Sequence, residues 1–326
     1  NNSVLTSLMN ADVIRSLDDL VEKHGQSLKP SQLIKINGKV MSVAFMANAQ
    51  HLVYRADILK QIGVKPPKTY EEMLAAAKMI REKGIMENPV GGAYMAGWNL
   101  ATEFINMYLG HGGEFYKPGT AELTINNDKG IATLKMMRSL SEYMNPDFLT
   151  HDSNATNAEF RAGNVAIMNM WGSRAATLVS AEGVPQEVKD GFAIDGPMTV
   201  GGGSTNATTL WWDGFAIAKN IPDAEAESSF ISLVHAIRPE MLTDETSLEA
   251  VWLIDGYKPT PAAKGVFAAA SSISLPYPSL PQQPLLHSAL GNELADFMQG
   301  KESAEQALND ITAAYNGAAK EKGFLQ

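Results

Sequence analysis

The chain has 326 residues, which is too many for one simple hydrophobic core, so two lobes are expected. Its formal net charge of −10 argues against nucleic acid as a partner, and the absence of cysteine excludes disulfides, thiol catalysis and thiolate metal sites. The residues are 45% hydrophobic, but no apolar run approaches the ~18 residues of a membrane-spanning helix.

Two short helical segments open the chain, at residues 3–10 and 16–20. Asn37-Gly38 is a two-residue turn signal. The apolar run 40–45 that follows is short and bounded by turn residues, which predicts a buried strand. After a polar linker, a second β-prone run at 52–54 predicts another strand.

Two helices are predicted next. The spacing of apolar residues predicts one over residues 56–62, closed by Gly63. Pro66-Pro67 prevents a helix there, because proline lacks an N–H and crowds the residue before it. Thr69 and Glu72 then form a capping box that opens an alanine-rich helix.

The remaining elements follow the same logic. Apolar spacing predicts a helix over residues 102–109 that paired glycines end, and Asn127 offers an N-cap for a helix from 130 to about 144. Further expected elements are strands within 164–168, 192–194 and 210–219, and helices at 222–235 and 303–316.

The order strand, linker, strand, helix, Pro-Pro-x-Thr, helix resembles the extracellular solute-binding proteins of bacterial ABC sugar importers, the group that includes maltose-binding protein. The residues that carry the resemblance are Asn37-Gly38-Lys39, Tyr54, Ile58-Leu59, Gly63 and 66–72. Four later stretches match the group in the same order: 160–168, 210–219, 257–261 and 300–308.

This resemblance implies an α/β, two-lobed periplasmic-binding-protein fold of type II, with hinge crossovers and a ligand cleft between the lobes. Lobe one is expected at 1–46 plus 217–262, and lobe two at 47–216 plus 263–326. The crossovers are expected at 46–48, 213–217 and 260–264. The resemblance also implies that about 80 residues that open lobe one in the family are not in this sequence.

Sugars present C–H faces and hydroxyl edges, so a sugar cleft needs aromatic planes and polar side chains. Trp98, Trp171 and Trp212 fall in predicted loops or at strand ends and are the aromatic candidates, with ordinary packing as the alternative. Trp211 and Trp212 are adjacent, so on a strand they face opposite ways and at most one lines the cleft.

Three polar residues complete the candidate site. Asp213 stands in an apolar run, where an unpaired buried carboxylate is costly, so a hydroxyl-donating ligand is a suitable partner. Asn48 lies at the first crossover, where the resemblance implies a ligand-contacting residue, and Arg174 follows Trp171. The alternative for Asp213 is a structural hydrogen bond. No metal ligand set or cofactor motif is found, and His51 is expected to be a satisfied strand histidine.

The resemblance implies a periplasmic, monomeric protein that binds a sugar, closes by a hinge and delivers the sugar to an ABC-transporter permease without chemical conversion. Three alternatives remain open: another solute such as an alditol, a sugar acid or a peptide; a sensor that docks a receptor; and a carbohydrate-active enzyme. The enzyme would need two converging acids.

Overall fold

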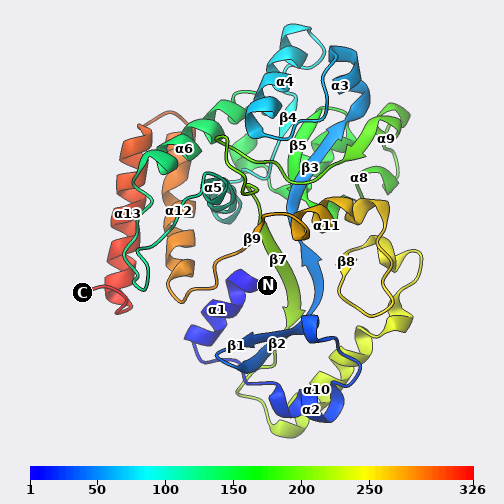
Figure 1. Cartoon of the computed structure of the whole chain (residues 1–326), viewed down its shortest axis with the longest axis vertical. Coiled ribbons are helices and arrows are strands. Elements are labelled where there is room, and N and C mark those ends of the chain that lie inside the picture. The colour runs from blue at the N-terminus through cyan, green and yellow to red at the C-terminus, as the bar shows by residue number, and fades with distance from the viewer. Residues whose placement is uncertain (176) are drawn as a thin grey trace.

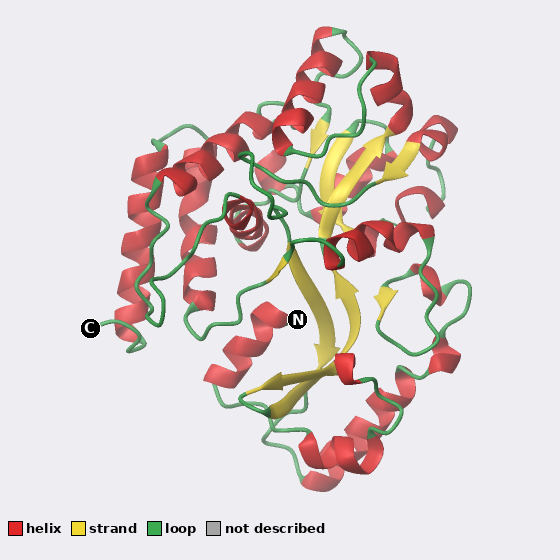
Figure 2. Ribbon diagram, in the orientation of Figure 1, coloured by secondary structure: helices red, strands yellow, loops and turns green. Residues whose placement is uncertain are grey.

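The computed structural model describes residues 1–175 and 177–326, whose strands form two sheets (Figures 1 and 2). Sheet one has the order β1 (Leu33–Ile36), β2 (Lys39–Asn48), β7 (Thr209–Phe215), β9 (Leu275–Pro276), and β8 (Val251–Trp252) also pairs with β2. Sheet two has the order β4 (Val90–Gly91), β5 (Ile167–Trp171), β3 (Gln50–Arg55), β6 (Phe192–Ile194).

Helices surround both sheets (Figure 2). Their bounds are α1 (Asn2–Asn10), α2 (Asp18–His24), α3 (Ala56–Ile62), α4 (Tyr70–Glu82), α5 (Trp98–Gly110), α6 (Asp128–Ser141), α7 (Ser153–Arg161), α8 (Thr177–Ser180), α9 (Gln186–Gly191), α10 (Asp223–Ala236), α11 (Lys264–Ala270), α12 (Gln283–Met298) and α13 (Ala304–Glu321). In the described ranges, no helix combines the length and the apolar character that crossing a bilayer requires.

The chain passes between the sheets along two adjacent strands. β2 ends at Asn48, and β3 begins at Gln50 after the fully buried Ala49, so the two strands follow one another along the long axis (Figure 1). β7 runs antiparallel beside β2, with Asn48 opposite Trp211. Residues near these crossings are therefore held close to both sheets.

Sheet one has an apolar layer on each face. Val40 packs in a cluster with Leu17, just before α2, and Phe230 of α10, while its neighbour Met41 packs with Leu5 of α1. This division follows from the strand geometry, because successive side chains point to opposite faces. The Asn37-Gly38 turn joins β1 to β2 with φ of 51° and 79°, as a tight hairpin requires.

The largest core surrounds sheet two and extends to the helices on the left of Figure 1. α5 is its centre, because every residue from Leu100 to Gly110 is buried. Burial on all sides explains the run of Leu, Phe, Ile, Met and Tyr in this segment, and Thr102, Glu103 and Asn106 are its buried polar residues. α12 and α13 pack against each other and cover α5 and α6.

The local predictions for the first helices are confirmed. α3 has the predicted bounds, and Gly63 after it takes the left-handed conformation with φ of 78°. Thr69 caps α4 by accepting the Glu72 N–H at 3.1 Å. The Glu72 carboxylate reaches back to the N–H of Lys68 at 2.6 Å, one residue earlier than in the expected capping box.

Two predicted bounds need correction. The helix expected at 102–109 already begins at Trp98, after Gly97, and no side chain caps it. The strand expected over 210–219 ends at Phe215, and the chain then leads toward α10.

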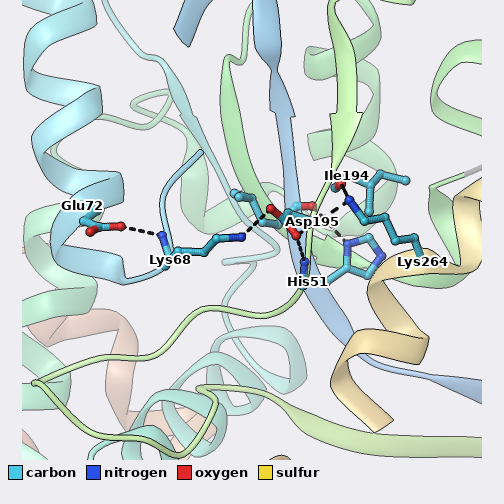
Figure 3. Close-up of polar contacts among 8 residues, drawn as sticks. His51, Lys68, Glu72, Ile194, Asp195 and Lys264 are labelled. Carbon is cyan, nitrogen blue, oxygen red and sulfur yellow. Dashed lines mark hydrogen bonds and ion pairs between the residues drawn. The ribbon is translucent and has the colours of Figure 1, made fainter. Parts of the chain in front are cut away.

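Asp195 ties three segments together beside β3 (Figure 3). Its carboxylate lies 2.5 Å from Lys68 Nζ, before α4, and 3.9 Å from Lys264 Nζ, at the start of α11. His51 is buried next to this group. Its Nδ1 contacts the Leu52 carbonyl at 3.2 Å, but its Nε2 has no partner, so it is only half satisfied. Burial lowers the pKa of His51 to about 4, and the ring is neutral at pH 7.

Candidate functional site

An open cleft of about 240 Å³ lies where the chain crosses between the sheets. Its walls combine three indole rings with amide, hydroxyl, carboxylate and guanidinium groups. The lining residues are Asn1, Asn48, Trp98, Asn99, Ser153, Trp171, Ser173, Arg174, Trp211 and Asp213. Five of the six predicted site residues are therefore brought together: Asn48, Trp98, Trp171, Arg174 and Asp213.

The three indoles form one aromatic cluster. Trp98 and Trp171 are stacked with an interplanar angle of 30° and ring centroids 6.5 Å apart. Trp211 meets both edge-on, at 5.6 Å from Trp98 and 5.5 Å from Trp171. Trp98 is 42% exposed, whereas Trp171 and Trp211 are buried. Trp98 thus offers an open ring to a ligand, and the other two form the wall beside it.

A second layer supports Trp98 from beneath. The ring of His287, on α12, stacks on Trp98 at 5.2 Å, and its Nε2 contacts the Trp98 carbonyl at 3.1 Å. The Tyr277 hydroxyl lies 2.8 Å from Nδ1 of the same ring. Nε2 therefore carries the proton and donates, while Nδ1 accepts from the tyrosine. Burial lowers the pKa of His287 to about 4, which keeps the ring neutral in this role.

Asp213 and Arg174 bring opposite charges to the cleft. The Asp213 side chain is 38% exposed, and its Oδ1 lies 4.0 Å from the backbone nitrogen of Asn1. Arg174 is exposed in the short 3-10 turn Gly172–Arg174, and its guanidinium makes no hydrogen bond or ion pair within the described part of the chain. The carboxylate of Asp213, with one long contact to Asn1, and the guanidinium of Arg174 thus stand at the cleft as acceptor and donor.

Asn48 lines the cleft and also has a structural role in the Gly172–Arg174 turn. Its Oδ1 accepts the N–H groups of Ala49 and Ser173, both at 3.1 Å, and its Nδ2 donates to Ser173 Oγ at 3.0 Å. These bonds fix the Gly172–Arg174 turn and use the amide oxygen and one of the two amide N–H groups. Ser173 lines the cleft at this point, although the sequence interpretation did not include it.

Trp212 does not line the cleft, and Trp211 takes the place predicted for it. Trp212 packs against the cluster of Leu5, Ile14 and Met41 on the other face of β7. The reason is strand alternation: Trp211 and Asp213 are two residues apart and share a face, and Trp212 lies between them. If Asp213 faces the cleft, the alternation of side chains along the strand places Trp211, and not Trp212, on the same face. The sequence therefore contained the information needed to choose between the two tryptophans.

A larger hollow, of about 420 Å³, lies away from the crossings among Glu87, Asn88, His151 and Glu159. It has no tryptophan, and its lining comes from segments around sheet two alone. Among residues 1–175 and 177–326, no group of three or more His, Cys, Asp or Glu side chains is placed to hold a metal ion.

The sequence matches one protein family over most of its length. Residues 2–234 match the model of the bacterial extracellular solute-binding protein family. A probable ABC transporter-binding protein of Deinococcus radiodurans is 30% identical over 195 residues, which are 57% of this chain and 44% of that protein. A probable sugar-binding periplasmic protein of Rhizobium meliloti is 28% identical over 167 residues, 48% of this chain and 39% of that protein. The matched regions thus span less than half of these relatives.

Solved structures share the fold at low sequence identity. A maltose-bound MalE3 of T. maritima superposes with a TM-score of 0.79 at 18% identity, covering 96% of this chain and 82% of that one. A solute-binding protein of Agrobacterium radiobacter K84, in complex with ribitol, reaches 0.82 at 18% identity over 97% and 83% of the two chains. These likenesses confirm the predicted α/β fold of type II periplasmic binding proteins. With the match over residues 2–234, they show that this chain belongs to the bacterial extracellular solute-binding protein family.

Proposed function

We propose that this protein binds a sugar in the cleft between two lobes and delivers it to the membrane permease of an ABC importer. The observation that carries the proposal is the cleft itself, in which three indoles stand beside a carboxylate and a guanidinium. Indole faces suit the C–H faces of a sugar ring, while Asp213 accepts from hydroxyl groups and Arg174 donates to them.

The names of the relatives support this ligand class. Both the Rhizobium meliloti relative and a third, from Mesorhizobium japonicum, are probable sugar-binding periplasmic proteins. Structures of the same fold hold maltose, ribitol and, in a protein of Agrobacterium vitis S4, D-mannitol. A linear alditol is therefore the second candidate ligand, because it has the same hydroxyl pattern without a closed ring.

The proposed lobes follow the two sheets in part: β7 and β9 pair in sheet one but fall within the bounds proposed for lobe two. Lobe one would comprise residues 1–46 and 217–262, and lobe two residues 47–216 and 263–326, with the hinge at 46–48, 213–217 and 260–264. α1, in proposed lobe one, contacts proposed lobe two, since Asn2 Nδ2 donates to the Leu210 carbonyl at 3.1 Å and Asn10 Nδ2 donates to the Pro281 carbonyl at 2.8 Å. Ligand would close the lobes by rotation about these strands.

A binding role without chemical conversion fits the cleft better than hydrolysis does. A glycosidase uses two carboxyl groups that flank the scissile bond. Asp213 is the one carboxylate among the described residues that line the cleft. The proposal therefore assigns no catalytic residue, and it places the protein in the periplasm as a monomer.

Isothermal titration calorimetry tests the proposal with a panel of maltose, glucose, ribitol and D-mannitol, and with glucuronate and a tripeptide as other solute classes. The expected result is saturable binding of one sugar with one site per chain, and an unchanged ligand by NMR after prolonged incubation. Formation of a product would overturn the binding role, and binding of the tripeptide alone would overturn the ligand class.

The partner is tested in the source bacterium. Deletion of the gene should abolish uptake of the radiolabelled sugar that calorimetry identifies. Normal uptake together with a lost transcriptional or chemotactic response to that sugar would instead indicate a receptor-docking sensor.

A further inference from the structure

A layer of buried polar side chains lies directly beneath the indoles of the cleft. Its members come from four elements: Gln50 on β3, Glu103 and Asn106 on α5, Asn169 on β5, and Thr208 and Thr209 leading into β7. All six are buried, with exposed fractions of 4% or less. Burying this many polar groups is costly unless they are hydrogen-bonded, and each of the six side chains makes at least one hydrogen bond.

Gln50 is the hub of the layer. Its Nε2 donates to Glu103 Oε1 at 2.5 Å, and its Oε1 accepts from Asn106 Nδ2 at 2.7 Å and from Asn169 Nδ2 at 3.0 Å. Its backbone N–H and carbonyl both bond to Thr208 Oγ1, at 3.2 and 2.9 Å. One residue thereby joins the first strand after the β2–β3 crossing to the segment that enters β7.

A chain of donors leads from this hub to the cleft wall. Thr209 Oγ1 donates to Asn106 Oδ1 at 2.6 Å and accepts the indole N–H of Trp211 at 2.7 Å. Thr209 and Trp211 are two residues apart on β7, so they share one face of the strand. The polar path therefore runs from Glu103 through Gln50, Asn106 and Thr209 to the ring nitrogen of Trp211.

The hydrogen bonds at the start of this path depend on the protonation state of Glu103, whereas the Trp211 indole N–H can only donate. An ionised Glu103 can only accept, which matches a Gln50 Nε2 that donates to it. A protonated Glu103 carries an O–H that needs an acceptor, but both lone pairs of Gln50 Oε1 are already used by Asn106 and Asn169. Protonation therefore disturbs the Gln50 end of the path, and a shift of the Gln50 amide is passed through Asn106 to Thr209.

We propose that Glu103 is a positioning residue that sets the hydrogen bonding of Trp211 in the cleft wall through Gln50, Asn106 and Thr209. Its effect on ligand affinity rests on the proposed function, but its effect on Trp211 does not.

Glu103 changes charge near neutral pH, whereas the titratable groups around it do not. Burial raises the pKa of Glu103 to about 7. The hydrogen bonds of the Gln50 and Asn169 amides lower this pKa, but by less than burial raises it. The charged or titratable groups that face it are Tyr70 and Tyr94, and burial raises the pKa of both phenols well above 10, so they stay neutral. His51 and His287 are neutral down to about pH 4.

The experiment is a pH titration of the tryptophan indole N–H resonances in ¹⁵N-labelled full-length protein without ligand, with the Trp211 signal assigned from Trp211→Phe. The Trp211 signal should shift with a midpoint near pH 7. Glu103→Gln should abolish the shift, and Glu103→Asp, which keeps an ionisable group, should restore a pH-dependent shift. Thr209→Val should also abolish it, because it removes the last link to the indole.

The Trp252 indole is the internal control. It donates to the Thr246 carbonyl, outside the polar layer, and its signal should not follow the Trp211 midpoint. A Trp211 signal that does not move in the wild-type protein overturns the proposal, as does an unchanged titration in Glu103→Gln or Thr209→Val. Because no ligand is added, these outcomes leave the proposed transport function untouched, and failure of sugar binding would leave this result untouched.

Discussion

The residues of the cleft differ in what their side chains still have free to offer. Asn48 has committed its amide to Ser173 and Ala49, and Trp211 has committed its N–H to Thr209. Asp213 and Arg174 lie at the cleft with their charged groups open to solvent. Groups that make no hydrogen bond within the protein, or one long contact as Asp213 does, can bind hydroxyls of a ligand without first breaking a strong bond.

Asp213→Ala is therefore expected to weaken binding of the sugar about 10- to 100-fold, since a hydrogen bond to a charged group contributes about 1.5–3 kcal/mol. The fold should be unaffected, because the side chain is 38% exposed. Calorimetry measures the affinity, and Asp244→Ala is the control, as Asp244 is exposed and does not line the cleft. Equal affinities for the two variants would show that the cleft is misplaced.

The adjacent tryptophans provide a matched pair. Trp211→Phe removes an indole from the cleft wall and its bond to Thr209, so sugar affinity should fall by up to about tenfold. Trp212→Phe changes only the apolar cluster on the opposite face, so affinity should stay the same while the unfolding temperature falls. The reverse pattern in calorimetry and thermal unfolding would place Trp212 in the cleft.

Three buried groups make stability depend on pH in opposing directions. His51 and His287 have folded-state pKa values of about 4 against 6.5 when unfolded, so they destabilise the fold as the pH falls from 6.5 toward 4. Glu103 has a folded-state pKa of about 7 against 4.5, so its contribution is full below pH 4.5 and is lost as the pH rises through 7. Glu103 thus partly offsets the histidines.

Replacing Glu103 removes its compensation of the two histidines, so stability is expected to fall more steeply as the pH is lowered. Between pH 6.5 and 4.5, Glu103→Gln should make the free energy of unfolding fall by about 1.4 kcal/mol more per pH unit than in the wild-type protein, the value for one proton. Urea unfolding at three pH values in this window measures the slope. Glu249→Gln, at an exposed position, should leave the slope unchanged, and an equal slope in Glu103→Gln would contradict the assignment.

At the scale of elements, helix ends with a local capping residue could be predicted from the sequence, and pairings between distant strands could not. The caps Thr69, Asn127 and Ser303 bond within their own helix ends, so a few residues of sequence contain the whole interaction. The start of α5 at Trp98 was missed because no side chain caps it. Strand β9 is two residues long and pairs with β7 across the chain, which no local pattern predicts.

The same distinction explains the site. Aromatic residues at strand ends and an acid in an apolar run could be recognised from the sequence. The occupation of Asn48 could not, because its partner Ser173 is 125 positions away. The Gln50–Glu103 pair, 53 positions apart, is likewise a product of the tertiary fold. Long-range contacts of the tertiary fold thus decide which polar residues remain free for a ligand, and the sequence pattern does not show these contacts.

Two glycines associated with helices are predicted to change the free energy of unfolding in opposite directions when replaced by alanine. Gly63 ends α3 with φ of 78°, a conformation that costs an L-residue about 1–2 kcal/mol, so Gly63→Ala should destabilise the protein by about that much. Gly317 lies inside α13, is exposed, and an added Cβ would meet no atom within 4 Å. Gly317→Ala should stabilise by about 0.5–1 kcal/mol.

Chemical denaturation of the two alanine variants measures both effects against the wild-type protein. Because each variant adds one methyl group on the surface of a helix, hydrophobic burial is similar and the sign reports the backbone conformation. A stabilised Gly63→Ala would mean that α3 does not end in the left-handed conformation.

At the scale of the whole molecule, the proposed function requires the lobes to move as bodies about a thin connection. The connecting strands are paired within the sheets up to Asn48, apart from an irregularity between Ala44 and Met46, and from Gln50 onward, with Ala49 between them. The cleft is lined from both sides of this point, by Asn48 and Asp213 on sheet one and by Trp171 on sheet two. A ligand that contacts both sides would therefore favour the closed arrangement.

Closure can be measured between α2 and α3, which lie at opposite ends of the molecule (Figure 1). The chain has no cysteine, so Asp19→Cys with Lys60→Cys, both at exposed positions, provides two unique sites for nitroxide labels. Pulsed electron paramagnetic resonance should show a shorter distance after addition of the sugar that calorimetry identifies. The control pair, Lys60→Cys with Lys320→Cys, lies within proposed lobe two and should keep its distance. If the first distance is unchanged at saturating sugar, binding does not close the lobes, because a rotation about Ala49 must bring α2 and α3 to a new separation.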